Sequence, residues 1–219
     1  MVDIFDEVDE ELRAERVQSL LKRYGGLIIA AALAVIAGAA GWQAWHWWQA
    51  KQDMAAAQHY LTAMTMADAA AAAGPANTKV TVAAFDALTR AGPDGYRTLA
   101  RLQAASQRAK AGDEKGAAAL WNDVASDTAA DPLLRDLASL LWCQNQIDSG
   151  DPGVLAARLT ALAEPNNAWR PLAKEQLALL DLRQGKTDAA KTTLRALMQE
   201  PTTPAGVRER VASLLERLG

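Results

Sequence analysis

The stretch from Gly25 to Trp48, GGLIIAAALAVIAGAAGWQAWHWW, constrains this chain most, because its 24 residues carry no formal charge. An α-helix rises about 1.5 Å per residue, so roughly 20 apolar residues cross the hydrocarbon core of a bilayer. The side chains with strong hydrogen-bonding demands, Gln43, His46 and the tryptophans, all lie in its last third. The sequence therefore predicts one membrane-spanning helix over residues 25–48.

Aromatic residues border this stretch on both sides. Amphipathic rings prefer the headgroup level of a membrane, where one edge is wet and the other is apolar. We expect interfacial anchors at Tyr24, Trp42, Trp45, Trp47 and Trp48.

Two other interpretations of the stretch are weaker. A buried core helix would need cover on every side, and the rest of the chain is too amphipathic to provide it. A cleaved signal peptide could use Ala37-Gly38-Ala39, but its apolar run would be shorter, and a short basic region would precede it. Here a long acidic segment comes first, and the apolar run continues into the tryptophans.

The distribution of Lys and Arg predicts the orientation. Four basic residues precede the span, whereas Lys51 is the only one that follows it before Lys79. Basic flanks stay in the cytoplasm. We therefore expect a cytoplasmic tail (1–24), a transmembrane helix (25–48) and an outer domain (49–219), which lies in the periplasm if the source is a bacterium. The protein would be a single-pass, type II protein of the inner membrane.

The tail reads as a short amphipathic helix over residues 3–24. Ile4, Val8 and Leu12 recur at helical spacing, and acidic residues precede basic ones, which suits the helix dipole. Two interpretations stay open: a solvated segment that only sets topology, or a docking helix for a partner. Within the span, Ala30 and Gly38 belong to a ridge of small residues that is compatible with a homo-oligomer.

Charge and cysteine content exclude several classes of protein. The net charge of −3 arises from the acidic tail, and the rest of the chain has acidic and basic residues in equal number. Such a neutral domain lacks the basic surface of a nucleic-acid binder. Cys143 is the only cysteine, so it forms no intramolecular disulfide, and we interpret it as a small core residue.

Beyond the span, apolar residues follow helical spacing and no strand is predicted. Residues 50–73 read as a helix with an apolar face at Tyr60, Leu61, Met64 and Ala67, and Gly74-Pro75 should end it.

The remainder contains a repeat with glycines 38 and 35 residues apart. Aligning the glycines brings small or large apolar residues into the same positions. The framework is Gly112, Ala117 and Trp121; Gly150, Leu155 and Leu159; and Gly185, Ala190 and Leu194. Each glycine follows one amphipathic helix and precedes another, and it suits the left-handed position just past a helix end.

Helix starts support this reading. Asp131-Pro132, Asp151-Pro152 and Thr203-Pro204 each place an N-cap before a proline at the first helical position. Helix-turn-helix units of about 34 residues are typical of tetratricopeptide repeats. The predicted fold class is all-α: a single N-terminal transmembrane helix followed by a tetratricopeptide-like α-solenoid of helix hairpins. A last helix over residues 205–218 should cap it with a polar outer face. Trp121, Trp142 and Trp169 could anchor a ligand in a groove, but core positions are the stronger interpretation.

Motifs of catalysis are missing. His46 and His59 have no cysteine or carboxylate at metal-ligand spacing, and no HExxH, GxSxG, phosphate-binding loop or dinucleotide fingerprint occurs. Acid pairs such as Asp113-Glu114 lie at predicted helix starts, where they act as caps. The sequence predicts no catalytic residue, cofactor or metal.

Three stretches resemble one family. EVDEELRAERVQSLLKRYGG (Glu7–Gly26), GYRTLARLQAASQRAKAGD (Gly95–Asp113) and DPLLRDLASLLW (Asp131–Trp142) are similar to bacterial inner-membrane proteins that act as ancillary subunits of the Sec translocon. Their tetratricopeptide-like domain is shared with periplasmic cell-division coordinators. The resemblance implies a single-pass protein beside the translocon, with secreted polypeptides and periplasmic chaperones as partners.

These observations together predict a binding scaffold and not an enzyme. The alternative is a cell-envelope or cell-division adaptor with the same fold. A third class, an enzyme with an unfamiliar site, would need a deep pocket lined by ionisable residues.

Overall fold

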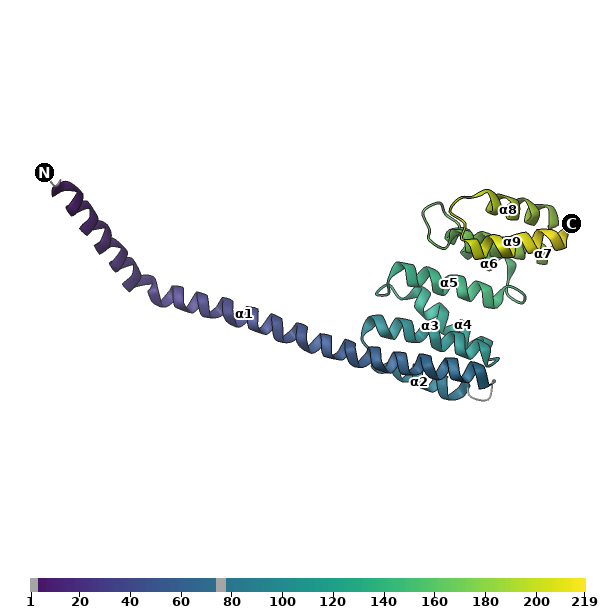
Figure 1. The fold of residues 1–219 in the computed structure, drawn as a ribbon, viewed down its shortest axis with the longest axis horizontal. Coiled ribbons are helices and arrows are strands. Elements are labelled where there is room, and N and C mark those ends of the chain that lie inside the picture. The colour runs from purple at the N-terminus through teal and green to yellow at the C-terminus, as the bar shows by residue number, and fades with distance from the viewer. Residues whose placement is uncertain (1–3, 74–77) are drawn as a thin grey trace. The chain divides into compact units, whose positions relative to one another are not determined.

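Helices form nearly all of the computed structural model, which describes residues 4–73 and 78–219 (Figure 1). In chain order they are α1 (Ile4–Ala73), α2 (Thr78–Ala91), α3 (Asp94–Lys110), α4 (Glu114–Ser126), α5 (Pro132–Gln146), α6 (Pro152–Leu162), α7 (Arg170–Arg183), α8 (Thr187–Gln199) and α9 (Ala205–Leu218). No strand occurs in the described ranges, so the all-α class is confirmed.

The first compact unit, Met1–Met54, contains the predicted membrane span. Over Tyr24–Ala70, α1 is the one helix in the described part of the chain that is long and apolar enough to cross a membrane. Its large apolar side chains are uncovered: Leu33 is 61 % exposed, Ile36 64 % and Trp42 69 %. α1 thus holds a candidate membrane span. Helix α1 begins at Ile4 and so includes the predicted tail helix from that residue on. The side chains of the apolar stripe expected in the tail, and residue Asp3, lie outside the described part of the structure.

Helix α1 extends to Ala73, as expected, and the predicted stop at Gly74-Pro75 lies outside the described residues. Its C-terminal part buries Ala63 and Ala67, with Tyr60 and Met64 packed beside them. Leu61, which we placed on the same face, is instead 63 % exposed. Each residue turns a helix by about 100°, so position 61 lies outside the stripe that repeats at positions 60, 63 and 67.

From Ala55 onward the chain forms a second unit of successively packed helices. Each helix from α2 to α8 packs against the next one in the sequence, and further contacts join α3 to α5, α5 to α7 and α7 to α9. From α3 onward, the first helix of each pair therefore also meets the first helix of the following pair (Figure 1). This connectivity is that of a solenoid of hairpins, as predicted.

Four hydrophobic clusters hold these pairs together, and each cluster draws on three successive helices. The buried members are Ala63, Ala67, Phe85, Leu88, Ala100 and Ala104 from α1–α3; Leu102, Ala105, Ala117, Trp121, Val124 and Ala138 from α3–α5; Leu140, Cys143, Leu155, Leu159, Leu162, Ala173 and Leu180 from α5–α7; and Ala178, Ala190, Leu194, Leu197, Val207 and Val211 from α7–α9. No pair buries its apolar face alone, which is why such units stack.

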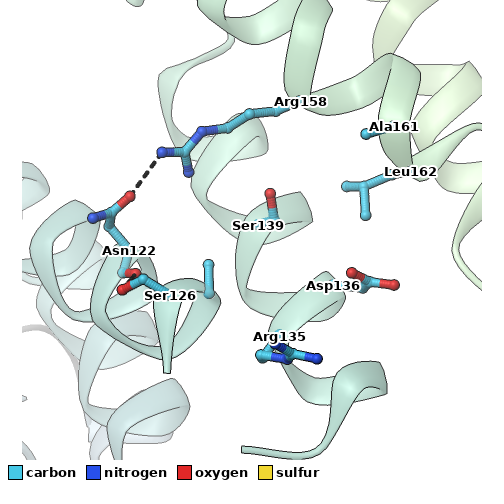
Figure 2. A pocket seen from close by; sticks show the side chains of 9 residues that line it. Asn122, Ser126, Arg135, Asp136, Ser139, Arg158, Ala161 and Leu162 are labelled. Carbon is cyan, nitrogen blue, oxygen red and sulfur yellow. Dashed lines mark hydrogen bonds between the residues drawn. The ribbon is translucent and has the colours of Figure 1, made fainter. Parts of the chain in front are cut away.

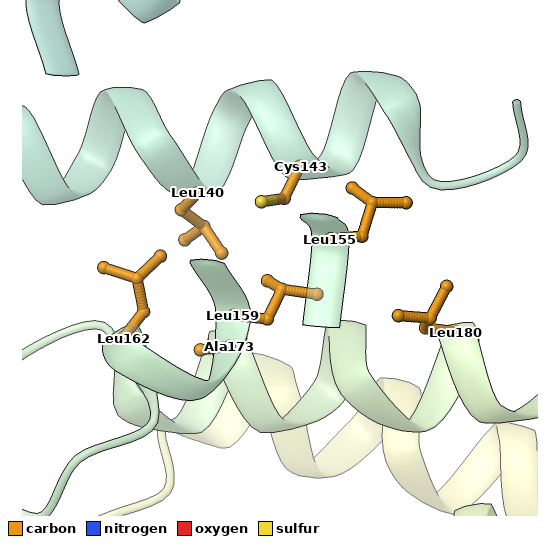
Figure 3. Packing of buried hydrophobic residues seen from close by; sticks show 7 residues of the cluster. All are labelled: Leu140, Cys143, Leu155, Leu159, Leu162, Ala173 and Leu180. Carbon is orange, nitrogen blue, oxygen red and sulfur yellow. The ribbon is translucent and has the colours of Figure 1, made fainter. Parts of the chain in front are cut away.

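The cluster between α5 and α7 shows the principle (Figure 3). Leu155, Leu159 and Leu162 recur at i, i+4 and i+7 along α6, so their side chains form one stripe. Leu140 and Cys143 meet this stripe from α5, while Ala173 and Leu180 meet it from α7. The small Ala173 lets the two helices approach closely.

The three glycines of the predicted framework lie in the turns within the pairs, but they act in two different ways. Gly112 and Gly185 have φ values of +81° and +76°, the left-handed region that glycine tolerates best. Gly150 does not adopt a positive φ, so the left-handed prediction is wrong for it. A Cβ at Gly150 would instead lie 2.9 Å from the backbone oxygen of Gln146. This glycine is required by close approach of the chain to the end of α5.

We expect Gly112→Ala to lower the free energy of unfolding by about 1 kcal/mol, because alanine is strained at a positive φ. Gly95→Ala is a matched control, since a Cβ would meet nothing within 4 Å at either position. Gly95 is the second residue of α3, where alanine is still the better helix former, so this variant should gain less than about 0.5 kcal/mol. Urea unfolding of the detergent-solubilised chain, followed by circular dichroism, measures both. Equal signs for the two substitutions would contradict the explanation.

Two of the three predicted helix starts are confirmed. Asp131 Oδ1 accepts a hydrogen bond from the backbone N–H of Leu133 at 2.7 Å, and Asp151 Oδ1 accepts one from Val154 at 2.9 Å. The third is wrong: Pro204 itself is the N-cap of α9, and Thr203 provides no cap. Thr203 is 2 % exposed and its hydroxyl has no partner, because the side chain turns into the protein instead of toward the helix end.

Helix α9 covers the end of the solenoid as predicted. Its Val207 and Val211 are buried against α7 and α8, while Arg208, Glu209, Glu216 and Arg217 are exposed.

Candidate interaction surface

The framework residues predicted from the repeat lie inside the solenoid. Ala117, Leu155, Leu159, Ala190 and Leu194 have no exposed surface. Trp121 is 4 % exposed, which agrees with a core position. Buried side chains of this kind cannot touch a partner. They set the spacing between helices, and thereby the positions of the polar residues on the surface.

The other two tryptophans of this unit are half-buried. The Arg158 guanidinium lies 4.1 Å from the centre of the Trp142 ring, a cation–π distance. Trp169 Nε1 donates a hydrogen bond to the backbone oxygen of Leu133 at 3.0 Å. Each ring thus packs on the core and reaches the surface at one edge.

The predicted interfacial residues lie along α1 in the first unit and remain uncovered. Exposure is 45 % for Tyr24, 69 % for Trp42, 61 % for Trp45, 60 % for Trp47 and 53 % for Trp48. The Lys51 ammonium lies 3.9 Å from the Trp47 ring centre, and the Trp42 ring packs against His46. Their anchoring role stays a prediction.

Several polar contacts between neighbouring pairs join residues that are 35 or 36 positions apart. Arg158 donates to Asn122 and Trp169 to Leu133 across 36 residues, and Arg210 donates to Glu175 across 35. These separations are close to the repeat length found among the framework residues, so equivalent positions of neighbouring pairs also contact each other at the surface.

An ion pair within a helix pair occurs in α3/α4 and in α7/α8, but not among the described residues of α5/α6 between them. Arg101 lies 3.0 Å from the Asp127 carboxylate and Lys174 lies 3.0 Å from Glu200, in both cases 26 residues apart. Asp127 and Glu200 directly follow α4 and α8, where the negative helix end disfavours an acid, so the basic partners compensate.

Glu200 also forms an ion pair with Arg170, so Arg170 and Lys174 both contact the Glu200 carboxylate. Burial, and next the nearby Arg170 charge, lower the pKa of Lys174. In the middle pair Asp136 accepts instead from Asn167 at 2.8 Å, and no base-to-acid contact forms.

Clefts open on this unit between the described helices. One, of about 280 Å³, lies among α4, α5 and α6 and is lined mainly by polar residues (Figure 2). Another, of about 450 Å³, lies between α7 and α9 around Glu175 and Arg210. Glu175 is 3 % exposed, and both of its carboxylate oxygens accept hydrogen bonds from Arg210, at 2.8 and 2.7 Å. This bidentate bond, together with the negative charge, raises the pKa of Arg210 against the opposing effect of burial.

These charged groups are not among the residues predicted from the sequence. A signal existed for Glu175, because an acid falls within the apolar stripe of Leu172, Ala173 and Leu177, and Arg210 follows one repeat period later. Arg135 in the first cleft had no such signal.

The described residues bring no three His, Cys, Asp or Glu side chains together. Cys143, interpreted from the sequence as a core residue, has no exposed surface. Burial raises the pKa of its thiol to about 11, although the Arg158 charge opposes this effect.

Cys143 is therefore expected to resist alkylation in the folded chain. A pKa near 11, against 9.0 for a free thiol, lowers the thiolate fraction at pH 8 about a hundredfold, and burial blocks access further. The folded state favours the protonated thiol, so this group should lower stability as the pH rises from 9 toward 11. Maleimide labelling at pH 8 with and without urea measures the difference. Equal labelling in both conditions would contradict burial of the thiol.

Comparison with known proteins agrees with this geometry. A family model described as a tetratricopeptide repeat-like domain matches residues 18–139, more than half of the chain. No curated protein and no solved structure matches the chain. The matched residues include α2 to α4 and the first part of α5, and each later helix up to α9 packs against the next in the same way. Domains of this kind bind protein partners through stacked helix pairs. The chain belongs to the tetratricopeptide repeat-like domain family.

Proposed function

We propose that the chain is a membrane-anchored scaffold for protein–protein interactions in the bacterial periplasm. Within this class, it acts as an ancillary subunit of the Sec translocon that links secreted polypeptides to periplasmic chaperones. The role requires neither catalysis nor a cofactor.

The observation that carries the proposal is the combination of an uncharged apolar stretch (25–48) within α1 and a tetratricopeptide-like domain on one chain. The resemblance of Glu7–Gly26, Gly95–Asp113 and Asp131–Trp142 to ancillary translocon subunits supports the specific role. Anchoring confines the scaffold to the membrane plane and raises its effective concentration near a partner there.

The proposed domains are a cytoplasmic tail (1–24), the transmembrane helix (25–48) and a periplasmic repeat domain (49–219). The excess of Lys and Arg before the span supports this orientation. In intact cells, a membrane-impermeant thiol reagent should therefore label a cysteine placed at the exposed Lys115 but not one placed at Arg13. The reverse labelling would overturn the orientation.

Affinity purification of the tagged, detergent-solubilised chain tests the partners. Sec components should co-purify with the full chain, and recovery of none would refute the translocon role. A chain that ends at Ala73 keeps the tail and α1 but loses the other helices. Equal recovery with this control would assign the contact to α1, whereas its loss would assign it to the repeat domain.

The second candidate, a cell-envelope or cell-division adaptor, is favoured by the domain shared with division coordinators. Depletion separates the two functions. Division defects with normal secretion support the adaptor, and defective secretion with normal division supports the translocon subunit.

A further inference from the structure

The cleft among α4, α5 and α6 contains an unusual set of polar groups for a position between packed helices. Arg135, Asp136 and Ser139 come from α5, Arg158 from α6 and Asn122 from α4 (Figure 2). Arg158 donates to Asn122 Oδ1 at 2.7 Å across one edge of the cleft. The volume of about 280 Å³ is large enough for one side chain of a partner.

Arg135 is the unexplained member of this set. The structure describes six half-buried arginines, and five of them bond to a carboxylate or an amide oxygen: Arg97, Arg101, Arg108, Arg158 and Arg170. Arg135 makes no hydrogen bond or ion pair with any described residue, and its Nε is buried without an acceptor. A guanidinium has five N–H donors and no acceptor, so a half-buried one without partners loses hydration and gains nothing in return.

The charge balance of the cleft favours an anion. Arg158 bonds to the neutral Asn122, and Asp136 is the one carboxylate in the lining. Asp136 accepts a hydrogen bond from Asn167, outside the lining, at 2.8 Å. Two guanidinium groups therefore face one carboxylate, which leaves one positive charge. A single negative charge balances this cleft, whereas a doubly charged phosphate would leave one negative charge uncompensated beside Asp136.

Ser139 supplies a further donor. It lies one helical turn after Arg135, so the two side chains share a face of α5. The Ser139 hydroxyl makes no hydrogen bond among the described residues, and Figure 2 shows it within the cleft between Arg158 and Asp136. Ser126, by contrast, already donates to the backbone of α4.

We propose that this cleft binds the carboxylate of one Asp or Glu side chain on a protein partner, with Arg135 and Ser139 as donors. The inference rests on the proposed scaffold function, since it gives the chemistry of a segment that the scaffold would recognise. Arg–carboxylate bonds are charge-assisted and directional, which suits an arginine held on a rigid helix.

Fluorescence anisotropy with the detergent-solubilised full chain tests the proposal. The probe is a fluorescein-labelled peptide of repeated Gly-Gly-Glu units, and the control peptide carries Gln in place of Glu. We expect binding of the Glu peptide alone, weakened about tenfold or more by Arg135→Gln, because a charge-assisted hydrogen bond is lost. Arg208→Gln, on the exposed face of α9, should leave binding unchanged.

Several outcomes would overturn the inference. They are equal binding of the Gln peptide, unchanged affinity of Arg135→Gln, or displacement of the probe by inorganic phosphate at lower concentration than by acetate. Arg135 has no partner to lose and its burial is uncompensated, so its substitution should not lower the melting temperature. If the variant nevertheless unfolds, Ser139→Ala decides: weaker binding by about threefold supports the site, and unchanged binding refutes it.

Failure of this site and failure of the translocon role give different results. A chain that binds the acidic peptide through Arg135 but recovers no Sec component keeps the site and loses the proposed partner. A chain that recovers Sec components, with no peptide affinity, keeps the partner and loses the site.

Discussion

Replacing Leu159 by alanine is expected to lower the free energy of unfolding by about 3 to 4 kcal/mol. Leu159 has no exposed surface and lies at the centre of the cluster shared by α5, α6 and α7 (Figure 3). Removing a buried leucine loses its transfer free energy and leaves a cavity, which together cost about 2 to 5 kcal/mol. The upper half of this range applies because rigid helices on both sides of α6 limit collapse into the cavity.

The effect should also spread along the chain. Each cluster joins one helix pair to the first helix of the next, so loss of this one weakens the contact of α7–α9 with α3–α5. Hydrogen exchange should therefore show faster opening on both sides of α6.

Leu133→Ala is the matched control, because Leu133 is 49 % exposed on α5 and belongs to none of the four clusters. It should cost less than about 1 kcal/mol, as surface substitutions do. Urea unfolding monitored by circular dichroism gives both values. A loss below 1 kcal/mol for Leu159→Ala would show that α6 is not held as described.

Arg210→Leu is expected to lower the free energy of unfolding by about 2 to 3 kcal/mol. The reason lies in its partner: Glu175 is 3 % exposed and receives two hydrogen bonds from Arg210. Without the guanidinium, the carboxylate stays buried and uncompensated, and such groups cost several kcal/mol. Arg210 is itself about half exposed, with 53 % of its side chain accessible, so water offsets part of the loss.

A double-mutant cycle tests this explanation. Glu175→Leu combined with Arg210→Leu removes both charges from a cleft that Leu179 and Leu214 already line, so the double variant should recover most of the loss. Arg208→Leu, exposed on the same helix and without a partner, is the control and should change stability by less than about 0.5 kcal/mol. A double variant as unstable as Arg210→Leu would mean that packing of the arginine, not its charge, holds α9.

Sequence periodicity determined the helical architecture of this protein. Apolar residues at i, i+4 and i+7 fix which face of α6 is buried, whatever lies opposite. Asp131 and Asp151 cap their helices through bonds to residues two or three positions away, so local sequence contains the whole interaction. The turns were predicted only in part. Gly112 and Gly185 adopt the left-handed backbone that the sequence predicts, whereas Gly150 is required because a Cβ would come too close to the backbone oxygen of Gln146.

The apolar span and the domain without net charge were both predicted by counting apolar, acidic and basic residues along the chain. Only the tertiary structure decided which charges are paired. Arg210 donates a hydrogen bond to Glu175, 35 residues away in the sequence, and Asp136 accepts one from Asn167, 31 residues away. Arg135 therefore forms no ion pair with a described carboxylate. Long side chains reach several neighbours, and the choice depends on how adjacent pairs pack. A pattern within one helix therefore predicts its buried face, whereas the polar surface that a partner meets depends on contacts between helices that are distant in sequence.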